Sequence, residues 1–244
     1  MSNITELKEK YLKPIFAETN AKRTKQWPVN SDNLAQYIDH TILKPDATDE
    51  EIIKVCNEAE EYKFRSVCVN PVNAKLAKSN LPTVDLCCVV GFPLGQNSTK
   101  ITVAEAKQAI DDGAVEIDMV INVGWLKSKK YDEVEADIAA VADVCHQNGA
   151  ILKVILETCL LTDEEKIMAC ILSMNANADF VKTSTGFSSG GATVEDVKLM
   201  REVVGENLGV KASGGVRDSE KAIAVINAGA NRIGASSSIK IIGK

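Results

Sequence analysis

Short apolar, strand-like segments alternate with amphipathic helical stretches eight times along this chain, and this alternation constrains the fold more than any other feature. Strands separated by helices pair in parallel, because each helix carries the chain back to the start of the next strand. We therefore predict an α/β fold with eight parallel strands, at residues 37–43, 65–70, 85–92, 116–122, 151–157, 180–185, 210–214 and 232–236. The predicted helices lie between them, at residues 49–62, 72–79, 100–112, 131–148, 163–177, 194–206 and 219–228.

Eight strand–helix units fit either a closed barrel or a large doubly wound sheet. A doubly wound nucleotide-binding sheet usually carries Gly-x-Gly-x-x-Gly after its first strand, whereas this chain has Lys-Pro-Asp-Ala at residues 44–47. The length of 244 residues also suits a single (β/α)8 TIM barrel, for which about 250 residues are typical. We predict one TIM-barrel domain over residues 31–244, with a last helix that is short or missing.

Residues 1–30 precede the first predicted strand and form an N-terminal extension in this interpretation. We expect a short helix near residues 4–13, followed by a linker, because Pro14 and Pro28 interrupt the segment. The extension contains Glu6, Lys8 and other charged residues where a secretion signal needs an apolar stretch.

The composition excludes several classes of function. A net charge of −6 argues against binding to nucleic acids or to anionic membranes, which require a basic surface. No apolar run approaches the ~18 residues of a membrane span. The seven cysteines form no Cys-x-x-Cys pair and fall mainly in predicted strands and helices, which is typical of buried thiols in a reducing compartment. We expect a cytoplasmic protein, and its oligomeric state stays open, a homodimer included.

Three of the predicted strands each carry one lysine within an apolar run: Lys153, Lys182 and Lys211. Burying an ammonium group is costly, so a lysine in a buried strand indicates a function or a charged partner. An amine among apolar groups and near a second cation loses its proton more readily, and the free amine can attack a carbonyl to form a Schiff base. The pattern predicts a Schiff-base lysine, although position alone does not rank the three.

The fourth predicted strand contains Asp118 in an apolar run, and an unpaired buried carboxylate is as costly as an unpaired lysine. A Schiff-base reaction needs an acid or base beside the amine, because forming and dehydrating the carbinolamine each move protons. Asp118 is the candidate for this role. The alternative is a buried Asp–Lys ion pair that only stabilises the barrel.

Glycines and serines gather after the last two predicted strands. Strand seven ends in Ser-Gly-Gly-Val-Arg at residues 213–217, and strand eight ends in Gly-Ala-Ser-Ser-Ser at residues 234–238. TIM barrels often hold phosphate at this place, because glycine lets backbone N–H groups approach the phosphate oxygens and serine adds hydroxyl donors. Either loop alone fits an ordinary tight turn, but their joint occurrence predicts a phosphate site.

Two other motifs do not support a function. Residues 186–190 match the Gly-x-Ser-x-Gly nucleophile elbow, but that mechanism requires a histidine after the serine, and both His40 and His146 come before it. Neither histidine has the spacing to a cysteine, an aspartate or the other histidine that a metal site needs. We therefore predict no metal site.

The segments KTSTG at residues 182–186 and KASGGVR at residues 211–217 closely resemble those of the deoxyribose-phosphate aldolase family. Further segments agree with the same family: DHT at 39–41, SVCVNP at 66–71, VGFPLG at 90–95, EIDMVIN at 116–122, KVILET at 153–158 and GASS at 234–237. They occur in order and at predicted strand ends, so the resemblance covers the chain from about residue 34 to 238.

This resemblance implies a class I aldolase, an aldehyde-lyase, on a TIM barrel. The family reversibly cleaves 2-deoxy-D-ribose 5-phosphate to acetaldehyde and D-glyceraldehyde 3-phosphate, a step of deoxyribonucleotide catabolism and carbohydrate degradation. The reaction runs through a lysine Schiff base, without a metal or an organic cofactor. The implied partner is thus a small phosphorylated sugar, with no nucleic acid and no membrane.

The resemblance also assigns roles to individual residues. Lys182 resembles the Schiff-base lysine, Lys211 the second lysine that promotes loss of its proton, and Asp118 the proton-relay carboxylate. The remaining matches are Gly214, Gly215, Ser236 and Ser237 in the phosphate loops, Thr185 and Cys68 in the substrate pocket, and Lys153 as structural support. Some members carry a phosphate-binding lysine where this chain has Phe187, so we expect backbone and serine donors to hold the phosphate here.

Two rival functions stay open at this point. One is another Schiff-base aldolase of phosphorylated sugars on the same barrel. The other is a barrel that binds a phosphorylated metabolite without catalysis. The second is disfavoured because Lys182, Lys211 and Asp118 are all present, and a binding protein has little reason to keep two costly buried ammonium groups.

Overall fold

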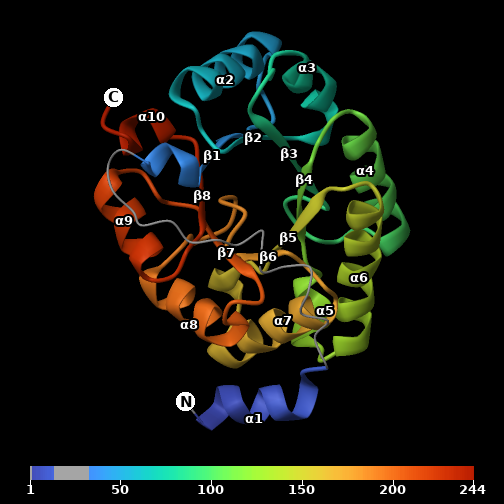
Figure 1. Cartoon of the computed structure of the whole chain (residues 1–244). Helices are drawn as coiled ribbons and strands as arrows, with labels where there is room; N and C mark the ends of the chain where they lie inside the picture. Colours follow the sequence, from blue (N-terminus) through green and yellow to red (C-terminus); the bar gives the residue numbers. More distant parts are fainter. Residues whose placement is uncertain (1, 14–32) are drawn as a thin grey trace.

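Eight parallel strands close into a barrel in the computed structural model, which describes residues 2–13 and 33–244. The strands follow one another in chain order, and the last pairs with the first, so the predicted TIM barrel is confirmed (Figure 1). The strands are β1 (Ile38–Ile42), β2 (Ser66–Val69), β3 (Asp85–Val90), β4 (Glu116–Val120), β5 (Ile151–Ile155), β6 (Phe180–Lys182), β7 (Gly209–Ser213) and β8 (Arg232–Ala235). Each ends shortly before its predicted end, because the last residues of the apolar runs already belong to loops.

Seven helices surround the barrel close to their predicted places: α2 (Asp49–Tyr62), α3 (Ala74–Ser79), α4 (Thr99–Asp111), α6 (Tyr131–Gln147), α7 (Asp163–Asn175), α8 (Val194–Val204) and α9 (Ser219–Asn227). The eighth position holds only the short α10 (Ser238–Ile241), as expected. Three short elements were not predicted: α5 (Val123–Lys127) and the 3-10 turns η1 (Leu34–Tyr37) and η3 (Thr158–Leu160); the turn η2 (Pro71–Asn73) precedes α3. Within the described residues, no helix combines the length and the apolar character that a membrane crossing requires.

Side-chain caps start several helices directly after the loops that follow the strands. Thr48 accepts a hydrogen bond from the backbone N–H of Glu51, and the Glu51 carboxylate accepts one from the N–H of Thr48. Thr162 and Glu165 form the same capping box at α7. Such a cap satisfies N–H groups that the first helical turn leaves unpaired. Each of these loops is therefore fixed by a strand at one end and by a capped helix at the other.

The barrel interior contains charged side chains beside a small apolar cluster, whereas the layer between strands and helices is apolar. In β4, Ile117 and Met119 belong to the main hydrophobic core, while Glu116 and Asp118 contact other strands inside the barrel. This is the two-residue period of a strand. Branched aliphatic residues usually fill a TIM-barrel interior. Here a layer of charged side chains takes part of that space.

The helix α1 (Ser2–Tyr11) lies outside the ring of barrel helices and packs against α7 (Figure 1). Leu7 is buried there, and the Asn175 side chain both accepts from the Lys13 backbone N–H at 2.9 Å and donates to the Tyr11 carbonyl at 3.0 Å. The predicted N-terminal helix is thus present, two residues earlier than expected. The predicted linker with Pro14 and Pro28 lies outside the described residues, and the boundary near residue 30 stays a prediction.

Candidate active site

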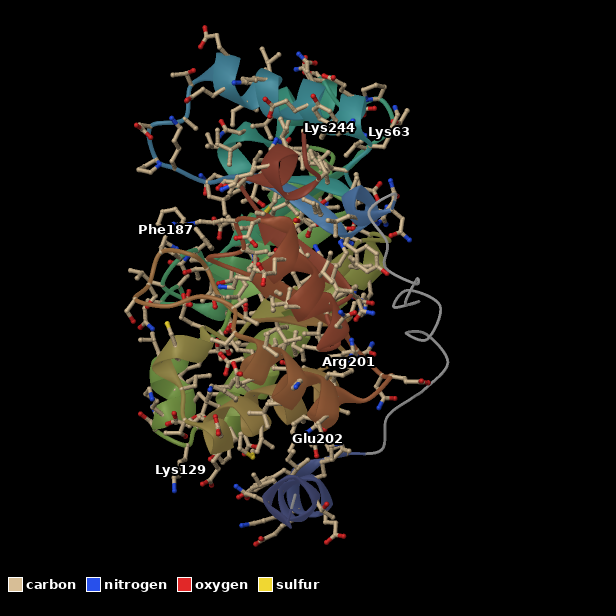
Figure 2. All side chains as sticks on the ribbon, turned by 90° about the vertical axis from the view of Figure 1, so that its left-hand side faces the viewer. Lys63, Lys129, Phe187, Arg201, Glu202 and Lys244 are labelled. Carbon is tan, nitrogen blue, oxygen red and sulfur yellow. The ribbon has the colours of Figure 1, made fainter. Side chains whose placement is uncertain are left out.

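A cavity of about 690 Å³ opens at the carboxyl ends of β1, β6, β7 and β8. Its wall includes Lys182 and Thr185 from the end of β6, Gly214 and Gly215 after β7, and residues 234–237 at β8. Figure 2 shows Phe187, which follows β6 and also lines the cavity, on the opposite side of the molecule from Lys63 and Arg201. The cavity therefore lies at the end of the barrel where TIM-barrel enzymes carry their active sites.

Lys182 lines this cavity and belongs to a buried cluster that includes Asp118 and Lys211. Lys182 and Lys211 are directly paired across β6 and β7, and Asp118 is paired with Lys153 across β4 and β5. Both Lys182 Nζ and Lys211 Nζ donate to Asp118 Oδ2 at 2.7 Å. Lys182 is 2% exposed, whereas Asp118 and Lys211 are completely buried. Strand register thus brings the three predicted reacting groups together.

The other oxygen of Asp118 is occupied as well. Lys153 Nζ donates to Oδ1 at 2.8 Å, and the Cys87 thiol lies 3.2 Å from the same oxygen. Burial alone would raise the pKa of the Asp118 carboxyl, but the charges of Lys153, Lys182 and Lys211 outweigh it and hold that pKa well below its usual value. Asp118 is therefore ionised, and it receives hydrogen bonds on both oxygens.

Deeper in the barrel, two more carboxylates and an arginine complete the cluster. Lys211 Nζ lies 2.5 Å from Asp39, and Lys153 Nζ lies 2.6 Å from Glu116. Arg232 bridges these two carboxylates, with Nε 2.9 Å from Asp39 and a terminal nitrogen 2.8 Å from Glu116. The sequence interpretation did not include Asp39, Glu116 or Arg232 in the site.

The cluster has one more cation than it has carboxylates. Its buried anions are Asp39, Glu116 and Asp118, and its buried cations are Lys153, Lys182, Lys211 and Arg232. The more exposed Arg65 reaches Glu116 at 3.8 Å, but its charge is matched by Asp85 at 2.8 Å. Three of the buried cations contact two carboxylates each. Among the described residues, Asp118 is the only carboxylate that Lys182 contacts. When all groups are ionised the cluster carries a charge of +1, and the loss of one proton makes it neutral.

Two carboxylates hold Lys211 in its charged form. Burial alone would lower the pKa of Lys211, but Asp118 and Asp39 outweigh this effect and raise that pKa above its usual value. Its side chain runs close to Gly234, where a Cβ atom would lie 2.1 Å from Ser213 Oγ and 3.1 Å from Lys211 Cε. Any larger residue at position 234 would therefore displace the Ser213 hydroxyl and crowd the Lys211 side chain.

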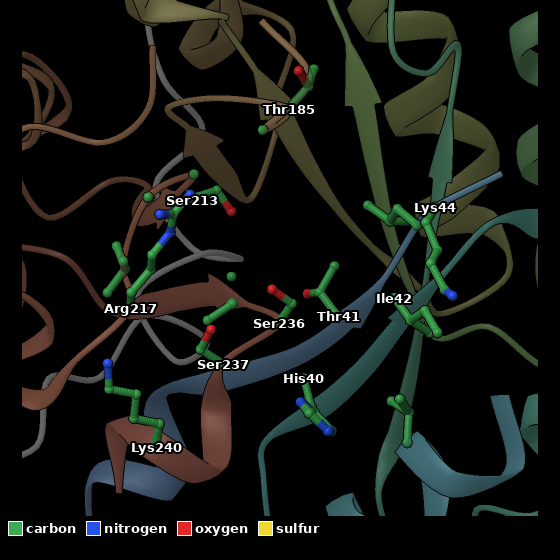
Figure 3. Close-up of a pocket in the computed structure, with 18 of the residues that line it drawn as sticks. His40, Thr41, Ile42, Lys44, Thr185, Ser213, Arg217, Ser236, Ser237 and Lys240 are labelled. Carbon is green, nitrogen blue, oxygen red and sulfur yellow. The ribbon is translucent and has the colours of Figure 1, made fainter. Parts of the chain in front are cut away.

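The predicted phosphate loops form the wall of the cavity next to β7 and β8. Gly214 and Gly215 have φ angles of 84° and 71°, in the left-handed region that favours glycine. Arg217 and Lys240 also line this part of the cavity, and Figure 3 shows both on the side of Ser237. The sequence interpretation proposed no cationic side chain for the phosphate. The structure offers two of them besides the backbone and serine donors.

Thr185 is held at the cavity by Glu157, a residue that the sequence interpretation did not single out. The buried Glu157 carboxylate accepts from Thr185 Oγ1 at 2.5 Å and from the Thr185 backbone N–H at 3.3 Å. Thr185 Oγ1 in turn accepts from the Phe187 N–H at 3.0 Å. Glu157 has a φ angle of 60°, a conformation that costs a non-glycine residue on the order of 1–3 kcal/mol. Glu157 is therefore a candidate for a residue that positions Thr185.

Cys68 lies beneath the cavity rather than in its wall. It is completely buried, and its sulfur, the Cys87 sulfur and an Asp118 oxygen all lie within 4.8 Å of one another. These three atoms are the donor types of a metal site, but the Asp118 carboxylate already receives three ammonium groups, so a divalent cation there would be repelled. The residues present do not fit a metal ion.

Six of the seven cysteines are buried free thiols, as expected, but Cys159 is exposed. Cys159 lies in η3, the turn after β5, and its sulfur is 3.4 Å from Ser188 Oγ. The turn η3 was not predicted, so the exposure of this residue was not apparent from the sequence.

A TIM barrel with buried lysines around one carboxylate at its floor, and with glycine and serine loops at β7 and β8, has the features of a Schiff-base aldolase. Residues 33–242 match the model of the DeoC/LacD family of aldolases, and the chain belongs to this family. Deoxyribose-phosphate aldolase from Clostridium novyi is 63% identical over 212 residues, which cover 86% of this chain and 95% of the relative.

Two further similar proteins are also described as deoxyribose-phosphate aldolases. Deoxyribose-phosphate aldolase from Thermococcus kodakarensis is 58% identical over 88% of this chain and 97% of its own length. A solved structure described as a tetrameric deoxyribose phosphate aldolase, from Aeropyrum pernix, superposes with a TM-score of 0.81 at 35% identity. That alignment covers 87% of this chain and 91% of the other.

Proposed function

We propose that this chain is a class I aldolase that reversibly cleaves 2-deoxy-D-ribose 5-phosphate to acetaldehyde and D-glyceraldehyde 3-phosphate. The observation that carries the proposal is the pair of hydrogen bonds from Lys182 and Lys211 to Asp118 Oδ2 at the floor of the cavity. The family match and the names of the relatives support the same reaction and the same substrate.

Lys182 acts as the nucleophile in this proposal. Its free amine attacks C1 of the open-chain sugar, and the carbinolamine loses water to give a protonated Schiff base. The C2–C3 bond then breaks as the C3 hydroxyl loses its proton, which releases glyceraldehyde 3-phosphate and leaves an enamine on Lys182. Protonation of the enamine at C2 and hydrolysis release acetaldehyde and regenerate the amine.

Asp118 moves protons at Lys182 Nζ in this proposal, and its distance of 2.7 Å from that atom supports the role. Lys211 contributes a fixed positive charge. With Lys153, Lys211 and Arg232 each between two carboxylates, neutral Lys182 leaves three cations matched to three anions. The cluster is therefore in electrostatic balance when Lys182 is the free amine that the reaction requires.

The phosphate group binds at Gly214, Gly215, Ser236 and Ser237, with Arg217 and Lys240 nearby. Held there, the sugar extends along the cavity toward Thr185 and Lys182, so phosphate binding positions C1 for attack. Each step above uses only side chains and water, and we expect no metal or organic cofactor. The free cysteine thiols support a reducing cytoplasmic environment.

A coupled assay tests the function directly. The protein is incubated with 2-deoxy-D-ribose 5-phosphate, and the release of glyceraldehyde 3-phosphate is followed; Lys182→Met serves as the inactive control. A panel of other phosphorylated sugars is assayed in parallel. A higher kcat/KM for another sugar would favour the rival aldolase function, and no cleavage of any sugar would overturn the proposal.

A further inference from the structure

His40 in β1 lies between α2 and the loop that follows β8. Its ring is buried, with Nε2 at 2.8 Å from Glu58 Oε2 and Nδ1 at 2.8 Å from Ser238 Oγ. The Phe64 ring packs against it with a centroid distance of 5.0 Å. Both ring nitrogens therefore have a polar partner, and the ring has a fixed orientation. None of the reaction steps above uses this residue.

Ser238 closes the loop that carries two of the proposed phosphate ligands. Its hydroxyl donates to the Ala235 carbonyl at 3.0 Å, so the two ends of the segment 235–238 are tied together around Ser236 and Ser237. Ala235 is also the β8 residue that pairs with His40 in the barrel. His40 thus holds the loop through the strand pairing at one end and through Ser238 at the other.

The hydrogen bonds of this group depend on one another. Ser238 has one hydroxyl proton, and it cannot be donated to the Ala235 carbonyl and to His40 Nδ1 at once. The Glu58 carboxylate can only accept, so His40 Nε2 donates to it. When His40 Nδ1 also carries a proton and donates to Ser238 Oγ, the Ser238 proton is free for the Ala235 carbonyl, and the loop is fully bonded. His40 therefore controls the direction of the bond that closes the loop.

We propose that His40 is a positioning residue that, held by Glu58, fixes Ser238 and thereby the loop that receives the substrate phosphate. The inference rests on the proposed function in one respect, namely that the phosphate binds at Ser236 and Ser237. It goes further in naming His40 as a determinant of preference for phosphorylated over unphosphorylated substrate. Figure 3 shows His40 on the side of Ser236 and Ser237 that faces away from Thr185.

Two isosteric variants separate the two contacts of the ring. In His40→Asn the introduced amide nitrogen can occupy the place of Nδ1 and donate to Ser238, whereas His40→Gln places its nitrogen near the position of Nε2 and reaches only Glu58. Both variants lose the ring and its contact with Phe64. A difference between them therefore reports on the bond to Ser238 and not on lost packing.

The first measurement is the kcat/KM for 2-deoxyribose 5-phosphate and for 2-deoxyribose in each variant. His40→Gln should lower the ratio of these values roughly fivefold to tenfold, the effect of one lost buried hydrogen bond. His40→Asn should recover most of the ratio. Ser238→Ala should lower the ratio at least as far as His40→Gln, because it also removes the bond to Ala235. The double variant should be no worse than Ser238→Ala alone, because the bond between His40 and Ser238 is already absent there.

The second measurement is direct binding of inorganic phosphate by calorimetry, which does not require catalysis. The affinity should follow the same order, with wild type and His40→Asn above His40→Gln and Ser238→Ala. If the wild-type protein binds phosphate but fails to cleave the sugar, the proposed function is wrong while the inference about His40 stands. Equal phosphate affinity in wild type and His40→Gln, or no phosphate binding in the wild type, would overturn the inference.

Discussion

Lys182 and Lys211 donate hydrogen bonds to the same atom, Oδ2 of Asp118, each at 2.7 Å. One carboxylate oxygen thus contacts an amine at the cavity and an amine that is completely buried. The two lysines differ in their remaining partners, because Lys211 also contacts Asp39 and Lys182 has no second carboxylate among the described residues. This difference supports the different roles that we propose for the two lysines, Lys182 as nucleophile and Lys211 as a fixed charge.

The assignment of the nucleophile can be tested by trapping. Sodium borohydride added with acetaldehyde should reduce the Schiff base and leave an ethyl group on Lys182, because this lysine alone of the three buried lysines lines the cavity. Peptide mapping by mass spectrometry identifies the modified residue. Without acetaldehyde, Lys182 should stay unmodified. An adduct on Lys153 or Lys211 would show that the assignment is wrong.

Lys211→Leu should abolish most activity near neutral pH and move the remaining rate to more alkaline pH. Three cations and three carboxylates then remain, so a neutral Lys182 leaves one carboxylate of the cluster without a matching cation. The pH profile of kcat/KM measures this change. Lys211→Arg keeps the charge and should keep the shape of the profile, even where size lowers the rate. Full activity of Lys211→Leu with an unchanged profile would contradict the role.

Asp118→Asn should fold and lose about 10²-fold to 10⁴-fold in kcat, the usual range for an acid–base group. Glu116→Gln is the matched control, because Glu116 is an equally buried carboxylate that contacts Lys153 and Arg232 but not Lys182. This control should lower the melting temperature with a much smaller effect on kcat. If Asp118→Asn stays active, the relay role is wrong, and if it fails to fold, a structural role is favoured.

Acid should unfold the protein through its buried carboxylates. The ionic contacts hold the pKa of Asp39, Glu116 and Asp118 below the usual values of 3.8 for Asp and 4.5 for Glu, despite burial. The unfolded state then binds more protons at these three groups in acid, so their contribution to the free energy of unfolding is constant above these values and falls as the pH drops below about 4.5. Urea unfolding between pH 3 and 8 measures the free energy of unfolding. In Glu116→Gln this free energy should fall less steeply as the pH drops. A stability that rises in acid would exclude this linkage.

Glu157→Gly should lower kcat/KM about tenfold with little change in melting temperature. Glycine suits the φ angle of 60° at this position, so the loop keeps its conformation, but Thr185 loses its hydrogen-bond acceptor. Glu157→Gln retains a side-chain oxygen for Thr185 and should stay within a few fold of wild type. Wild-type kcat/KM in the glycine variant would show that Glu157 does not position Thr185.

The strands and the buried lysines could be predicted because their signal is local. A lysine within an apolar run is visible in any single strand, and the alternation with helices indicates which end of the strand carries the site. This local signal indicated Lys153, Lys182, Lys211 and Asp118 without knowledge of their distances. The choice of Lys182 and Lys211 among the three lysines came from the family resemblance, and their chemical roles remain to be tested.

The rest of the cluster depends on barrel closure. Arg232 and Asp39 are separated by 193 positions and meet only because β8 pairs with β1. Each stands near the start of its strand, where a charged residue is ordinary, so neither carries a local signal. His40 was interpreted as isolated for the same reason, since Ser238 lies 198 positions away. Glu157 depends on a backbone conformation that its residue type does not indicate.

All seven charged groups of the cluster belong to strands, whereas Thr185, Ser236 and Ser237 belong to loops. Because side chains alternate between the two faces of a strand, inserting one residue in β6 ahead of Lys182 would turn this lysine away from the barrel interior. Loops tolerate changes in length far better. Evolution and laboratory selection can thus alter which aldehydes this barrel accepts by changing its loops. Insertions or deletions within the strands would instead separate the charged groups of the cluster.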